Sequence, residues 1–139
     1  LVVENIEESL NLYRSFISSE LETWEVTPWK KSDGLNFLRN ISDVEYRTTA
    51  MLLPGSAIKL ELMEFRGIEQ QRYRPVFQDI GFGHVAFLTG DIEAVYEKMN
   101  ELEMKAVSKT GTWTEISPTT RAIYTRDHNN FFVEIIERR

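Results

Sequence analysis

Residues 81–94 read GFGHVAFLTGDIEA and join an apolar strand pattern to the start of a helix. Within this stretch, Asp91 is suited to a helix N-cap, and Ile92 with an acidic first turn follows it. Residues 2–8, VVENIEE, repeat the same order with Asn5 at the capping position. Self-similarity of this kind indicates that the chain contains two copies of one structural plan.

Each cap is followed by apolar residues spaced three to four positions apart, which is the pattern of an amphipathic helix. We therefore predict helices over residues 6–18 and 92–102, each with one apolar face in the core. The two faces consist of Ile6, Leu10, Tyr13 and Ile17, and of Ile92, Val95, Met99 and Leu102.

Segments with strand character follow each helix, and turn-forming residues separate the last two segments of each copy. The order predicts an α+β fold in which a βαβββ module occurs twice. We expect a single domain, 1–139, with module one at 1–65, a connector at 66–80 and module two at 81–139. The predicted strands are 22–27, 45–53 and 58–65 in module one, and 83–89, 105–109, 121–126 and 131–137 in module two.

The length and charge of the chain restrict its class. It has 139 residues, which suits one domain, and its 22 acidic against 16 basic residues give a net charge of −6. This balance disfavours electrostatic binding to nucleic acid or to an anionic membrane. With 0 Cys, a metal site would need His and carboxylate ligands, and a cytoplasmic location is expected. A small-molecule partner fits this composition.

The sequence begins without Met and within a strand pattern, so we expect that residues upstream of Leu1 are missing. Ile6 and Ile92 are equivalent and lie 86 positions apart. This offset places the counterpart of His84 three positions before Leu1.

Three ionisable residues interrupt otherwise apolar strands: Glu61 in IKLELMEF, His84 in GFGHVAFL and Glu134 in FFVEIIE. A strand that is apolar on both faces is usually covered on both faces, so a carboxylate there needs a cation or several donors. Imidazole and carboxylates suit Zn²⁺, Ni²⁺, Fe²⁺, Co²⁺ or Mn²⁺. A shared metal site is one interpretation, and ion pairs with Arg or a hydrogen-bonded core His are the alternative.

The paired plan and four segments resemble the vicinal oxygen chelate superfamily, which includes glyoxalase I, bleomycin-resistance proteins, methylmalonyl-CoA epimerase and extradiol dioxygenases. The resemblance implies that the two modules form a cupped, largely antiparallel mixed sheet. The segments are VENIEESLNLYRSFI at 3–17, LELMEF at 60–65, GFGHVAF at 81–87 and FFVEIIE at 131–137.

In metal-dependent members of this superfamily, one ligand comes from the first strand and one from the last strand of each module. By resemblance, Glu61, His84 and Glu134 occupy three of these places, and the fourth lies upstream of Leu1. The implied protein is a metal-dependent lyase or isomerase that acts on a small oxygen-rich substrate through an enediolate-type intermediate. Glu134 or Glu61 would move the proton, and the resemblance also implies a homodimer.

Two alternatives remain open. One is a metal-free binding protein that sequesters a small aromatic or antibiotic-like ligand. The other is a small ring-cleaving dioxygenase, which needs two His and one carboxylate around Fe²⁺. The residue three places before Leu1 would discriminate between metal binding and sequestration. His128 is expected at a turn on the surface.

Three residues of module two are candidates for substrate binding: Trp113, Arg121 and Tyr124. They could line the cup or recognise an anionic substrate. The alternative is that the aromatic residues pack in the protein and that Arg121 is solvated.

Overall fold

The structure is a computed structural model that describes residues 1–31, 33 and 43–139. The chain divides into two compact units, Leu1–Gln71 and Arg72–Arg139. This division falls within the predicted connector, residues 66–80. None of the helices among the described residues is long and apolar enough to cross a membrane.

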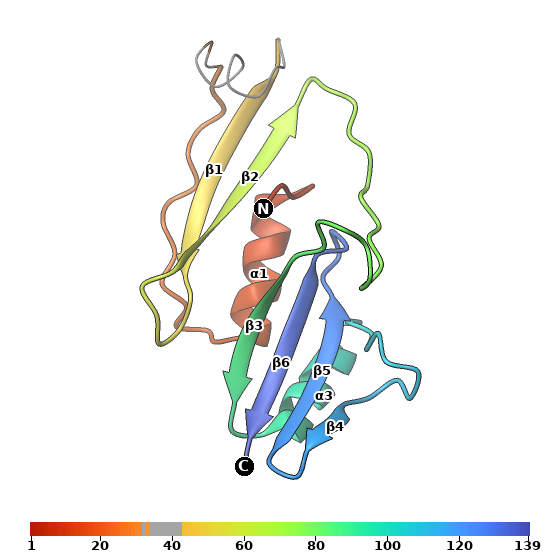
Figure 1. The fold of residues 1–139 in the computed structure, drawn as a ribbon. Helices are drawn as coiled ribbons and strands as arrows, with labels where there is room; N and C mark the ends of the chain where they lie inside the picture. Colours follow the sequence, from red (N-terminus) through yellow and green to blue (C-terminus); the bar gives the residue numbers. More distant parts are fainter. Residues whose placement is uncertain (32, 34–42) are drawn as a thin grey trace. The chain divides into compact units, whose positions relative to one another are not determined.

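The first unit contains helix α1 (Ile6–Phe16) and an antiparallel pair of strands, β1 (Glu45–Leu52) and β2 (Lys59–Arg66) (Figure 1). Val2 forms a parallel bridge with Met63 of β2. The strand predicted at the start of module one is therefore represented by this single bridge beside β2.

Helix α1 begins where the sequence predicts, because the Asn5 side chain accepts a hydrogen bond from the backbone N–H of Glu8 at 3.0 Å. Ile6, Leu10 and Tyr13 are buried, as the spacing predicts. The helix ends at Phe16 rather than at residue 18.

The second unit contains β3 (His84–Thr89), α3 (Ile92–Glu101), β4 (Thr114–Ser117), β5 (Thr120–Arg126) and β6 (Phe132–Arg138). The strand order is β3-β6-β5-β4. β3 runs parallel to β6, and the other pairs are antiparallel. Figure 1 shows α3 on one face of this sheet, so we expect a metal or substrate site on the opposite face.

The α+β class is confirmed, but the strand that follows each helix differs from the prediction. Residues 22–27 and 105–109 are not strands. They lie beside β1 and β5 through isolated bridges, such as Ala106 with Thr125, and a few backbone hydrogen bonds, such as Thr27 N–H to the Thr48 carbonyl at 2.9 Å. After Ala106 the backbone turns, and Gly111 adopts a φ of 71°, so the ladder cannot continue. Strand β4 forms later, and all four of its residues are exposed, which explains why no apolar alternation marks it.

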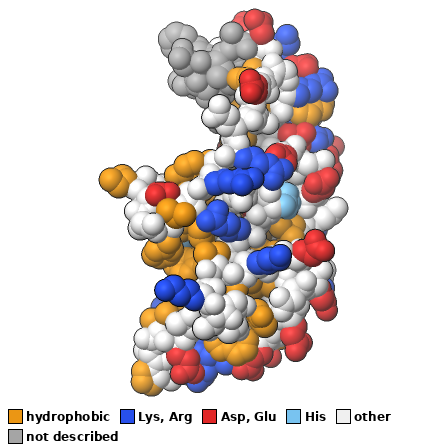
Figure 2. Space-filling view, turned by 90° about the vertical axis from the view of Figure 1, so that its right-hand side faces the viewer, with side chains coloured by type: hydrophobic (Ala, Val, Ile, Leu, Met, Phe, Trp, Pro, Cys, Tyr) orange, Lys and Arg blue, Asp and Glu red, His pale blue; other side chains and the backbone are white. Residues whose placement is uncertain are grey.

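Apolar side chains remain exposed in the second unit, and Figure 2 shows that apolar side chains reach the surface in patches. Phe77 is 56% exposed and Leu88 is 70% exposed. Both values are high for large apolar side chains.

Candidate metal and substrate site

His84 and Glu134 lie in direct contact on one face of the second unit's sheet. His84 opens β3 opposite Phe132, and Glu134 lies opposite Ala86, so the parallel register places both side chains on the same face. His84 Nε2 lies 3.0 Å from Glu134 Oε2. The side chains are 33% and 14% exposed, so the pair is sheltered but reachable from solvent.

Tyr124 completes this polar group from the neighbouring strand. It lies opposite Glu134 in the β5–β6 register. Burial and the neighbouring Glu134 carboxylate raise the pKa of Tyr124 to about 12. The phenol therefore stays protonated near neutral pH and is available as a hydrogen-bond donor beside the carboxylate.

Aromatic rings surround the imidazole. The Phe82 ring stacks on His84 with the ring centroids 5.7 Å apart, and Tyr124 meets His84 edge-on at 5.4 Å. These contacts favour one orientation of the imidazole, with Nε2 toward Glu134. We call these rings and their neighbours the aromatic cluster, which consists of Phe77, Phe82, His84, Tyr124 and Phe132.

The pair His84 and Glu134 fits part of a divalent metal site, because it offers one imidazole nitrogen and one carboxylate side by side. In residues 1–31, 33 and 43–139, no group of three or more His, Asp or Glu side chains is placed to hold an ion. Two of the three predicted ligands therefore lie together, and further ligands would have to join them.

Glu61, the third predicted ligand, lies in β2 of the first unit, opposite Ala50. The expectation that apolar neighbours cover this strand on both faces is wrong at Glu61, which is exposed. An exposed carboxylate keeps its hydration and needs no buried partner. Its role as a ligand stays a prediction.

Arg121 lies on the other face of the second unit's sheet, toward α3. Its Nε donates to Glu137 Oε2 at 2.6 Å, and its Nη1 donates to Glu93 Oε1 at 2.5 Å. The Arg121 guanidinium also lies over the Trp113 ring, 5.5 Å from its centroid. The guanidinium thus contacts two carboxylates and a ring, and with its side chain 11% exposed Arg121 is not solvated, so that alternative is wrong. Substrate binding by Trp113 and Arg121 stays a prediction.

Glu137 is a structural carboxylate that the sequence reasoning missed. It accepts the backbone N–H of Ile92 at 3.1 Å, the first residue of α3. This bond, with help from Arg121, holds the pKa of Glu137 below its ordinary value. Glu137 is buried at 4% exposure and joins the helix start to the sheet.

The same arrangement occurs in the first unit. Glu64 accepts the backbone N–H of Ile6 at 2.9 Å, and Arg47 Nη2 donates to Glu64 at 2.7 Å. Arg47 Nη1 also donates to Glu7 in the first turn of α1 at 2.7 Å. A sequence signal was present: each last strand carries two glutamates three positions apart, in ELME at 61–64 and EIIE at 134–137. Odd spacing in a strand puts the two on opposite faces.

No protein-family model and no curated protein sequence matches this chain. Solved structures do match its fold. A glyoxalase family protein from Bacillus cereus aligns over 99% of this chain and 89% of its own, with a TM-score of 0.80 and 16% sequence identity.

Two further structures match at similar coverage. A glyoxylase/bleomycin resistance protein/dioxygenase domain from Frankia sp. has a TM-score of 0.64 at 15% identity, over 99% of this chain and 87% of its own. The fosfomycin resistance protein FosX from Listeria monocytogenes, complexed with Mn(II) and sulfate, has a TM-score of 0.57 at 15% identity, over 99% and 86%. This chain therefore has the fold of these glyoxalase-like structures.

Proposed function

We propose that this chain is a metal-dependent lyase or isomerase that acts on a small oxygen-rich substrate. His84 and Glu134 are the proposed core of the metal site, and Glu61 is the proposed third ligand. The observation that carries the proposal is the 3.0 Å contact between His84 Nε2 and Glu134 Oε2 on the open face of the sheet. The Mn(II) in the FosX neighbour supports a divalent ion in this fold.

A divalent ion at this site would polarise a substrate oxygen and so ease removal of a proton from the adjacent carbon. In this proposal the Glu134 carboxylate accepts that proton and returns it to a neighbouring carbon. Glu61 is the alternative base. In this proposal the Tyr124 phenol, which lies opposite Glu134, orients the carboxylate and contacts the substrate.

The test is metal binding by the purified protein. Titration with Mn²⁺, followed by calorimetry and elemental analysis, should give one ion per chain. His84→Ala and Glu134→Ala should weaken binding strongly, and Glu61→Gln should weaken it if Glu61 is a ligand. His128→Ala is the matched control, because His128 is the other of the 2 His in the chain. Equal binding by His84→Ala and His128→Ala would overturn the proposal.

A metal-free binding protein is the second candidate, and the aromatic cluster favours it. Phe77 lies in this cluster and is 56% exposed, so the surface could hold an apolar aromatic ligand without an ion. Ligand binding that persists with no metal, and that His84→Ala leaves unchanged, would support this candidate against the first.

A ring-cleaving dioxygenase remains a narrower alternative. It requires a second His beside His84 and Glu134, and the resemblance places that residue upstream of Leu1. Oxygen consumption with a catechol in the presence of Fe²⁺ would test it.

The homodimer and the cytoplasmic location are further proposals. Both rest on the resemblance and on the composition of the chain. Light scattering on the purified protein tests the dimer, and fractionation of expressing cells tests the location.

A further inference from the structure

We infer that the ligand of this site carries a neutral, planar apolar group, such as a benzene ring, which packs against Phe77 and Phe82. The inference rests on the proposed function for the position of the ligand's oxygen atoms at His84 and Glu134. It adds the chemical class of the remainder of the ligand.

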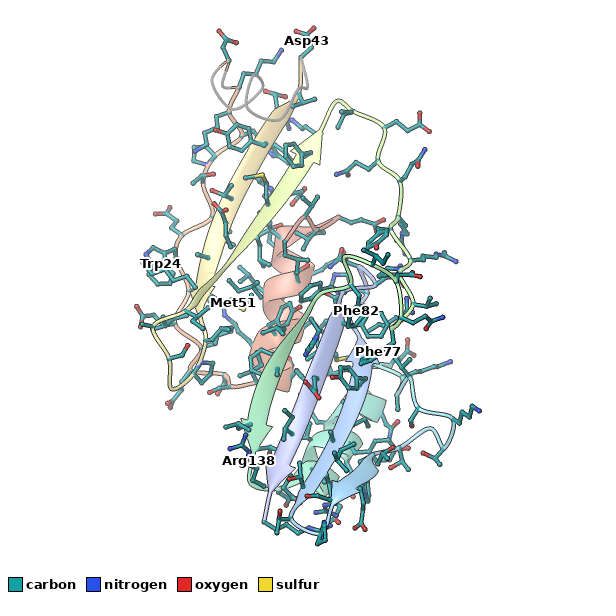
Figure 3. All side chains as sticks on the ribbon, in the orientation of Figure 1. Trp24, Asp43, Met51, Phe77, Phe82 and Arg138 are labelled. Atoms are coloured by element: carbon teal, nitrogen blue, oxygen red, sulfur yellow. The ribbon has the colours of Figure 1, made fainter. Side chains whose placement is uncertain are left out.

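The first observation is the arrangement of the rings. The Phe77 ring lies 5.0 Å from Phe82 and 5.1 Å from Tyr124, and Phe82 in turn stacks on His84. Figure 3 shows Phe77 and Phe82 close together beside β5 and β6. The rings thus form a continuous apolar path that starts at the imidazole and ends at the half-exposed Phe77.

The second observation is that the segment carrying these rings is held in place. The Pro75 carbonyl accepts a hydrogen bond from Arg126 Nη2 at 2.7 Å. Asp79 accepts the backbone N–H of Val76 through its side chain at 2.7 Å and that of Phe82 through its carbonyl at 3.0 Å. Because these bonds fix the segment on both sides of Phe77, a ligand would meet preformed rings at a reduced entropic cost.

The third observation is the charge beside the rings. Arg126 lies over the Phe132 ring of the aromatic cluster at 4.2 Å and already donates to Pro75. Glu134 contributes a carboxylate. The Glu134 carboxylate would therefore repel an anionic group on the ligand, and the Arg126 guanidinium already donates its hydrogen bond to Pro75. A neutral ring would instead bury apolar surface on Phe77.

The inference is tested with three oxygen chelators that differ in the rest of the molecule. Calorimetry on the Mn²⁺-loaded protein compares benzohydroxamate, acetohydroxamate and phosphonoformate. We expect benzohydroxamate to bind about tenfold more tightly than acetohydroxamate, equivalent to about 1.4 kcal/mol, because its ring replaces a methyl group. Equal affinities, or tighter binding of phosphonoformate than of benzohydroxamate, would overturn the inference.

Variants assign the preference to particular rings. Phe77→Ala should bring the ratio between the two hydroxamates close to one, and Phe82→Leu, which removes the ring but keeps an apolar side chain in the cluster, should lower it. Tyr73→Ala, which removes an aromatic side chain 65% exposed in the same segment, is the matched control and should leave the ratio unchanged. A ratio that persists in Phe77→Ala and Phe82→Leu would also overturn the inference.

A metal-free experiment separates this inference from the proposed function. In protein treated with EDTA, the fluorine NMR signal of 4-fluorobenzyl alcohol should broaden with wild type and with the Tyr73→Ala control, and not with Phe77→Ala. If the protein binds no Mn²⁺ but this pattern is observed, the proposed function fails and the inference stands. If the probe signal is unchanged by wild type, the inference fails whatever the metal result.

Discussion

The two units use the same carboxylate network on one face of their strands and differ on the other face. In the first unit, Glu64 joins Arg47 to the start of α1, and in the second, Glu137 joins Arg121 to the start of α3. Each guanidinium also binds a glutamate in the first helical turn. This repeated network ties helix to sheet and so belongs to the fold.

On the opposite face the equivalent positions diverge. Glu61 lies opposite Ala50, whereas Glu134 lies opposite Tyr124 and contacts His84. A glutamate held by arginine and a helix N-terminus serves stability. Glu134, which contacts His84 and lies opposite Tyr124, is the glutamate that we propose for chemistry. In each unit the two glutamates lie three positions apart on the same strand.

The largest expected effect is on the metal site. Glu134→Gln should lower Mn²⁺ affinity about 100-fold, because the amide lacks the charge of the carboxylate ligand. Calorimetric titration measures the affinity. Urea unfolding should show that the variant remains folded, and an unchanged Mn²⁺ affinity would remove Glu134 from the site.

The second-largest expected effect is on stability, and it distinguishes Glu64 from Glu61, the two glutamates of β2. Glu64→Gln should lower the free energy of unfolding by about 2 kcal/mol, since it weakens charge-assisted hydrogen bonds to Arg47 and to the Ile6 N–H. Glu61→Gln, on the exposed position of the same strand, should change it by less than about 0.5 kcal/mol. Urea unfolding of both variants checks the difference, and equal losses would contradict the assignment of the two faces.

The third effect is a dependence of stability on pH. The folded pKa of Glu137 lies below its ordinary value of 4.5, so the unfolded chain takes up this proton first as the pH falls. The stabilisation from Glu137 is therefore complete above about pH 4.5 and is lost as the pH falls through the folded pKa. Unfolding curves between pH 7 and pH 3 measure the loss.

A pair of variants identifies the group responsible. Glu137→Gln should be less stable than wild type at pH 7 and should show a flatter acid profile. Glu101→Gln, which alters an exposed pair with Lys98, should retain the wild-type profile. An unchanged profile in Glu137→Gln would show that another group controls the acid transition.

The smallest effect concerns Tyr124. Tyr124→Phe keeps the ring and removes the hydroxyl beside Glu134, a hydrogen-bond donor that we propose orients the carboxylate, so Mn²⁺ affinity should fall about fivefold. Calorimetry measures this change. If the same variant retains the benzohydroxamate preference, the fall in Mn²⁺ affinity comes from the lost hydroxyl and not from a displaced ring. A 100-fold loss of Mn²⁺ affinity would contradict a merely orienting role for Tyr124.

Local signals predicted the parts of the fold that depend on local physics. The caps at Asn5 and Asp91 and the apolar spacing placed both helices, because capping and amphipathic spacing act within a few residues. Alternation along residues 131–137 placed Glu134 on the face of Phe132, as the register shows. The α+β class followed from the repeat.

The features of the fold and site that the sequence did not predict depend on contacts between residues far apart in the sequence. Alternation could not show that Glu61 is exposed, because burial depends on what covers the strand. It could not reveal that Tyr124 lies opposite Glu134, which is set by the β5–β6 register. Residues 105–109 have strand composition, but their ladder stops where the backbone turns toward Gly111.

The most direct measurement of the central claim is an anomalous difference map from crystals of the protein grown with Mn²⁺. The account predicts one peak that is coordinated by both His84 Nε2 and the Glu134 carboxylate, and that is lost in Glu134→Gln crystals. A fully occupied Mn²⁺ elsewhere, with the direct His84–Glu134 contact retained, would contradict it.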